Sequence, residues 1–188
     1  MNAWGLATGL LPVLLFLPAL RLMDSYKLVR RRDIARSIAA GLLCAAIAYV
    51  ANSTLVHQAH LDPILLRRYA GPVIEEILKA VLVVYLIRAA KVGFLVDAAV
   101  HGFAIGTGFA LAENLYYALS LEHPSIGLWL ARGLGTAILH GSTTALVAIL
   151  AQELTERHRS KSLLLFLPGL ALATVLHSLY NHVLFNPL

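Results

Sequence analysis

Residues 71–87 read GPVIEEILKAVLVVYLI, and this stretch decides how the rest of the chain is interpreted. Glu75, Glu76 and Lys79 lie inside a segment that is otherwise apolar enough to enter a bilayer. A charge at that depth costs about 2.5–3.5 kcal/mol on insertion scales, so it usually faces a protein interior or a wet cavity. The three side chains therefore predict a functional site inside a helical membrane domain.

The composition also indicates a membrane protein. The chain has 188 residues, of which 59% are hydrophobic and 13% are charged. A soluble domain of this length carries about twice that share of charge. We therefore expect an all-α, polytopic membrane protein with a single membrane-embedded domain over residues 1–188. Cys44 is the only cysteine, which excludes an intramolecular disulfide.

Six apolar runs approach the length of about 20 residues that a membrane span needs. The first has no Lys or Arg in front of it, so we expect a retained span and not a secretory signal. Pro72 suits the first turn of the third helix, and glycines 102, 106 and 108 give the fourth a small face for close packing. The predicted spans are Trp4–Leu22, Ile34–Ala51, Pro72–Ile87, Val96–Leu119, Ile126–Leu150 and Leu163–Leu184.

Basic residues set the predicted orientation. With six spans, three connections lie on one face of the membrane, and they hold eleven of the fifteen Lys and Arg residues. Basic residues favour the cytoplasmic side, so both termini are expected to be extracytoplasmic. The basic stretch 21–36 is interpreted as a determinant of topology, and a nucleic-acid site is not expected.

Five polar residues on four spans then fall at similar depths. At a rise of about 1.5 Å per residue, Glu75 and Glu76 lie about one turn inside the outer end of the third span. Glu113 lies about two turns below the outer end of the fourth span, His140 near the middle of the fifth, and His177 about two turns below the outer end of the sixth. We expect one polar layer in the outer half of the membrane.

Helical spacing adds detail to this layer. Lys79 can pair with Glu75 at i,i+4 or with Glu76 at i,i+3, so spacing alone leaves the choice open. His177 and Asn181 are i,i+4 and share a face. Outside the layer, we expect structural or interfacial roles for Asp97, His101 and Arg132. We expect no particular role for His182.

Carboxylates, imidazoles and an amide in a low-dielectric layer suit hydrolysis. A carboxylate or metal centre can activate water, and a polar donor can stabilise the oxyanion. Glu113, His140 and His177 supply three zinc ligands with a fourth position open, which is the usual arrangement of a catalytic zinc site. No local metal motif is present, so this prediction depends on long-range convergence.

These residues resemble the motifs of the PrsW family of bacterial intramembrane proteases. That family is related to the CAAX prenyl endopeptidases and to bacteriocin-processing membrane proteins. The resemblance covers residues 71–188, and the first two spans carry no motif. The matching elements, in family order, are Glu75-Glu76-x-x-Lys79, Phe109-x-x-x-Glu113-Asn114, His140 and His177-x-x-x-Asn181.

The resemblance implies an intramembrane endopeptidase of the cell membrane that cleaves a membrane-anchored, anti-sigma-factor-like substrate on its extracytoplasmic side. Glu75 would activate the water, with Glu76 and Lys79 supporting the site, and Asn181 would help to bind the oxyanion. A divalent metal, with zinc the first candidate, would be bound by Glu113, His140 and His177. Asn114 would support these ligands.

Two further functions remain open at this point. An ion-coupled transporter could use the same layer as a proton relay, although the spans show no inverted repeat. The second alternative is a non-catalytic scaffold or substrate-binding subunit. The wider group includes a scaffold subunit of gamma-secretase, and a shared fold does not guarantee a shared activity.

Overall fold

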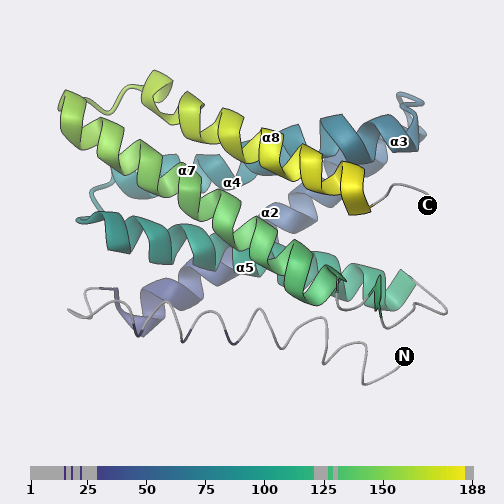
Figure 1. The fold of residues 1–188 in the computed structure, drawn as a ribbon, viewed down its shortest axis with the longest axis horizontal. Coiled ribbons are helices and arrows are strands. Elements are labelled where there is room, and N and C mark those ends of the chain that lie inside the picture. Colours follow the sequence, from purple (N-terminus) through teal and green to yellow (C-terminus); the bar gives the residue numbers. More distant parts are fainter. Residues whose placement is uncertain are drawn as a thin grey trace.

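The computed structural model describes residues 29–120, 127–128 and 131–184, with three isolated positions nearer the N-terminus (Figure 1). The predicted first span, Trp4–Leu22, lies almost wholly outside the described residues. The described part contains helices and no strand, as the all-α prediction requires. The helices are α2 (Arg31–His57), α3 (Pro63–Leu65), α4 (Gly71–Arg88), α5 (Leu95–Ser120), α7 (Ala137–His158) and α8 (Leu167–Leu184). Three tighter or wider turns complete the order: the π-helical η1 (Leu66–Ala70) and η2 (Ala131–Thr136), and the 3₁₀ segment η3 (Leu163–Phe166).

Four helical segments are long and apolar enough to cross a membrane: Arg31–His57, Leu95–Ser120, Ala131–His158 and Leu163–Val183. They correspond to the second, fourth, fifth and sixth predicted spans, and the chain is a multi-pass membrane protein. α4 matches the predicted third span in position, but it has 18 residues and includes Glu75, Glu76, Lys79 and Arg88. These charged residues distinguish α4 from the four segments that are apolar enough to cross a membrane.

α5 forms the centre of the bundle, with α7 on one side and α2 on another (Figure 1). Gly106 of α5 lies so close to α7 that an added Cβ would overlap the backbone carbonyl of His140. Gly41 of α2 lies equally close to the carbonyl of Ile105. Small residues at such crossings let helix backbones approach closely. The packing role predicted for the glycines of this helix is therefore confirmed, and it fixes His140 relative to α5.

The start of α4 is positioned by the turns before it. The carboxylate of Asp62 accepts hydrogen bonds from the backbone N–H groups of Ile64 and Leu65, and this caps α3. The π-helical η1 follows and leads into α4, where Pro72 occupies the first turn as predicted. Ser178 of α8 donates a hydrogen bond to the carbonyl of Arg68 in η1. These contacts hold the first turns of α4, which carry the two glutamates, against α8.

Candidate active site

Glu76 and Lys79 form a fully buried ion pair at the centre of the bundle. Nζ of Lys79 lies 2.7 Å from Oε1 of Glu76, and both side chains are 0% exposed. Nδ1 of His177 lies 2.8 Å from the same oxygen, and the hydroxyl of Thr143 donates to it at 3.4 Å. A buried carboxylate is stable only when it is paired and hydrogen-bonded. Three donors on one oxygen meet that condition and tie α4 to α7 and α8.

The other contact of Lys79 determines which nitrogen of His140 carries a proton. Nζ of Lys79 lies 3.0 Å from Nδ1 of His140. An ammonium group can only donate, so Nδ1 accepts and carries no proton. The proton of the neutral imidazole is then on Nε2, which donates to Oε2 of Glu113 at 3.0 Å. The hydrogen-bond partners thus assign His140 as the Nε2–H tautomer.

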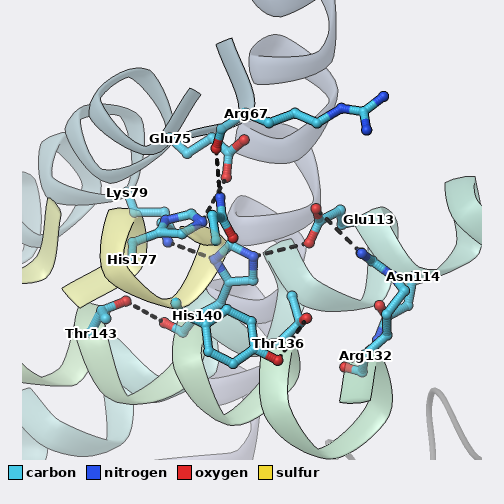
Figure 2. Close-up of polar contacts among 12 residues, drawn as sticks. Arg67, Glu75, Lys79, Glu113, Asn114, Arg132, Thr136, His140, Thr143 and His177 are labelled. Atoms are coloured by element: carbon cyan, nitrogen blue, oxygen red, sulfur yellow. Dashed lines mark hydrogen bonds and ion pairs between the residues drawn. The ribbon is translucent and has the colours of Figure 1, made fainter. Parts of the chain in front are cut away.

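His177 has the opposite tautomer. Its Nδ1 faces the carboxylate of Glu76, which can only accept, so Nδ1 carries the proton. In the neutral imidazole Nε2 then has a free lone pair, and it lies 3.8 Å from Oε2 of Glu75. The rings of His140 and His177 meet edge to face, with centroids 4.8 Å apart. Figure 2 shows His177 and Glu113 on opposite sides of His140.

Glu75 contacts an amide and an imidazole, whereas Glu76 is paired with the ammonium group of Lys79. Oε1 of Glu75 accepts a hydrogen bond from the side-chain amide of Asn52 at 3.3 Å. Oε2 has no hydrogen-bond partner among the described residues and lies nearest to His177. Glu75 is also the more exposed of the two glutamates, with 14% of its side chain accessible. Oε2 of Glu76 also has no hydrogen-bond partner among the described residues, but Glu75 is the glutamate of the pair that lines the cavity described below.

Asn52 is a site residue that the sequence analysis missed. It lies on α2, which carries no motif, and one residue beyond the predicted end of the second span. Its Oδ1 atom is buried and has no hydrogen-bond partner among the described residues. No charged residue lies within one helical turn of Asn52, so the sequence around it gives no sign of a site. Only the packing of α2 against α4 reveals its contact with Glu75.

Glu113 is held by a second buried cation. Nη2 of Arg132 lies 3.3 Å from Oε1 of Glu113, close enough for an ion pair but not aligned as a hydrogen bond. The guanidinium of Arg132 stacks over the ring of Tyr117, 3.6 Å from its centroid. Asn114 donates to the backbone carbonyl of Arg132 at 3.5 Å. Arg132, for which the sequence suggested a structural role, therefore belongs to the wall of the site.

A cavity of about 720 Å³ opens beside these groups. Glu75, Glu113, Arg132 and His177 line it together with apolar residues of α2 and α5. Phe109 also lines it, with its ring 4.9 Å from the ring of His140 and 4.9 Å from Nζ of Lys79. The cavity is large enough for a segment of peptide, and its wall is a mixture of apolar and charged groups, as binding sites usually are.

Asn181 also lines this cavity, but one of its donors is already engaged. Its side-chain amide donates to the backbone carbonyl of Arg67 at 2.8 Å. An amide NH₂ group has two N–H donors, so the second is left for another acceptor. His182, for which no role was expected, makes other contacts, with Nδ1 at the carbonyl of Ser178 and Nε2 at the hydroxyl of Tyr69.

The distances in the site are compatible with a metal ion. Glu75, His140 and His177 each offer one ligand atom, and these atoms lie within 4.8 Å of one another. Zinc binds nitrogen and carboxylate oxygen at about 2.0–2.2 Å, so two of its ligand atoms lie at most about 4.4 Å apart and the three side chains would have to move slightly closer together around an ion. Glu113 is one of the ligands predicted from the sequence, whereas in the structure its carboxylate contacts His140 and Arg132.

The hydrogen bonds of the three candidate ligands restrict metal binding more than the distances between them do. A histidine ligand must offer a lone pair to the ion. His177 can do so through Nε2, and Glu75 through Oε2. His140 cannot in this arrangement, because Lys79 occupies the lone pair of Nδ1 and Nε2 carries the proton donated to Glu113. Metal binding by His140 therefore requires Lys79 to release Nδ1.

The fold and the site define a helical membrane protein with a buried glutamate–histidine cluster facing a cavity. A family model described as the PrsW family intramembrane metalloprotease matches residues 30–188. The chain belongs to this family, as the motif resemblance predicted, and it is an intramembrane protease by family, whose substrate is a membrane protein. Neither the curated proteins nor the solved structures gave a match.

Proposed function

We propose that this chain is an intramembrane endopeptidase in which Glu75 activates the water that cleaves the peptide bond. One observation carries the assignment: Lys79 pairs with Glu76 and not with Glu75. The pairing leaves Glu75 as a carboxylate that lines the 720 Å³ cavity, and its Oε2 has no hydrogen-bond partner among the described residues and lies beside Nε2 of His177. A base needs both a free lone pair and access to the substrate, and Glu75 has the two together.

The reaction follows from these positions. A water between Oε2 of Glu75 and Nε2 of His177 gives a proton to Glu75 as its oxygen attacks the scissile carbonyl. Negative charge then develops on the carbonyl oxygen, and the second N–H of Asn181 is a donor for it. As the C–N bond breaks, Glu75 returns the proton to the leaving amine.

The remaining residues position these groups. Glu76 orients the ring of His177 so that the lone pair of Nε2 faces Glu75. Lys79 and Glu113 hold the two nitrogens of His140, and Asn114 supports the backbone that carries Arg132. Networks of this kind fix a reactive geometry before the substrate arrives, which lowers the cost of reorganisation during the reaction.

The side of cleavage comes from the charge distribution. In the topology predicted from the sequence, eleven of the fifteen basic residues belong to connections on the face opposite to that of Glu75, and basic residues favour the cytoplasmic side. We therefore place the site in the extracytoplasmic half of the cell membrane. A membrane-anchored regulatory protein, such as an anti-sigma factor, is the substrate class that the family resemblance favours.

A metal-assisted form is the second candidate, favoured by the 4.8 Å grouping and by the description of the family. Glu75, His140 and His177 would hold a divalent ion, with zinc the first choice, and the ion would polarise the scissile carbonyl. Metal analysis of the purified chain and of a Lys79→Met variant distinguishes the two forms. One equivalent of zinc in the parent chain, lost on His140→Ala, would establish the metal form.

The test of the activity is cleavage of a reporter membrane protein in proteoliposomes. We expect Glu75→Gln to abolish cleavage, with Glu153→Gln as the matched control on the exposed face of α7. If Glu75→Gln retains full cleavage, the assignment of the base is wrong. If no variant changes a measured function in a partner complex, the scaffold alternative replaces the protease, and ion-dependent uptake would favour the transporter.

A further inference from the structure

A second cavity of about 550 Å³ lies at the opposite end of α2, α4 and α5 from Glu75. It is bounded by the start of α2, the last turns of α4 and the start of α5, which meet at one end of the bundle (Figure 1). None of its lining residues belongs to the site described above. The polar residues that line it are Arg30, Asp33, Arg36, Ser37, Lys91, Asp97 and His101.

The inner wall of this cavity is polar and rigidly held. The hydroxyl of Ser37 and Nδ1 of His101 are hydrogen-bonded at 2.9 Å, and both residues are buried. Oδ2 of Asp97 accepts from the backbone N–H groups of Gly93 and Phe94, at 3.1 and 3.0 Å. Its other oxygen is buried without a hydrogen-bond partner among the described residues. Buried polar groups are normally satisfied, so this wall lacks a partner that a bound molecule or water would supply.

The charges around the cavity do not cancel. Arg36 and Asp33 pair with each other at 3.1 Å. Of the other charged lining groups, Arg30 and Lys91 are cations and Asp97 is an anion. The lining residues that the structure describes therefore carry an excess of one positive charge, and a ligand with a single negative charge would neutralise it.

The remaining wall of the cavity is apolar and continues onto the surface of the bundle. Leu82, Leu86 and Ile105 line it, and the ring of Tyr85 is 61% exposed at its edge. Val81, one turn back on α4, is 58% exposed. In a membrane protein such a surface faces lipid chains, and basic residues at a helix end lie at the level of the headgroups.

We propose that this cavity binds the headgroup of an anionic phospholipid whose phosphodiester carries one negative charge. Arg30 and Lys91 contact the phosphate, and the glycerol of the headgroup lies against the wall formed by Ser37, Asp97 and His101. The acyl chains follow the apolar face of α4 past Leu82 and Tyr85. A lipid headgroup and a free phosphate ion would both offer a phosphate to this cavity, and the test distinguishes between them.

The test uses the full chain in neutral detergent, titrated with phosphatidylglycerol and followed by native mass spectrometry. We expect one tightly retained phosphatidylglycerol per chain, with weaker retention of phosphatidylcholine. Each cation near a membrane surface changes the affinity for anionic lipid about fivefold, so Arg30→Gln with Lys91→Gln should weaken binding about 25-fold. The matched control is Arg32→Gln, an exposed cation in the first turn of α2, two residues after Arg30, that does not line the cavity.

Two further variants separate a built site from diffuse attraction. Ala40→Phe fills the cavity without changing any charge and should abolish retention, while Arg30→Lys with Lys91→Arg should preserve it. Thermal unfolding confirms that each variant is folded. An equal effect of Arg32→Gln and Lys91→Gln would overturn the proposal, because it would show non-specific attraction. Displacement of the lipid by an equal concentration of inorganic phosphate would also overturn it in favour of a soluble ligand.

Discussion

Lys79 pairs with Glu76, with 2.7 Å between Nζ and Oε1 and with neither side chain exposed. Helical spacing allowed the lysine to pair with either glutamate, and the structure resolves that choice. The pairing divides the two adjacent carboxylates into one that holds the bundle together and one that faces the cavity. The first predictions follow from this division.

Conservative substitution of the two glutamates should give opposite results. We expect Glu75→Gln to lower the cleavage rate by about 10²–10⁴, the usual contribution of a general base, with little change in thermal unfolding. Glu76→Gln removes the counter-charge of a buried lysine and should lower the free energy of unfolding by about 3–5 kcal/mol. Unfolding in detergent and single-turnover cleavage measure the two effects separately. Equal loss of stability in both variants would contradict the division.

Removing the buried ion pair as a whole should restore stability without restoring activity. Lys79→Met alone leaves the carboxylate of Glu76 without its cation and should destabilise the chain by about 3–5 kcal/mol. Adding Glu76→Leu removes the uncompensated charge, so we expect the double variant to regain most of that loss. His177 then has no acceptor for Nδ1, and cleavage should remain absent. A double variant that is stable and active would show that Glu76 does not orient His177.

Asn52 should affect the rate of the reaction and not the binding of the substrate. Its hydrogen bond to Glu75 is made to a charged group, and such a bond contributes about 1.5–3 kcal/mol. We expect Asn52→Leu to lower kcat about 10- to 100-fold while KM changes less than threefold. Thr54→Ala, at an exposed position of α2 that does not line the cavity, is the control. A change confined to KM would instead assign Asn52 to substrate binding.

The sequence predicted which residues meet, but not how they pair. Hydropathy and the placement of basic residues were enough to bring Glu75, Glu113, His140 and His177 to one depth, because depth depends only on helix length and direction. The partners of Lys79 and Arg132 depend on side-chain packing between helices, which spacing within one helix does not determine. Asn52 was missed for the same reason, since its role comes from the contact of α2 with α4.

The close contact between α5 and α7 gives a last prediction, because it positions His140 through the backbone. A Cβ added at Gly106 would overlap the carbonyl of His140, so Gly106→Ala must push the two helices apart. Overpacking of this kind costs about 1–3 kcal/mol, and the shift would also lengthen the hydrogen bonds of His140 to Lys79 and Glu113. We expect reduced thermal stability together with reduced kcat. Gly93→Ala is the matched control, because its Cβ would make only an ordinary contact, 3.4 Å from Asp97. Full activity of Gly106→Ala would mean that the geometry of His140 does not depend on this crossing.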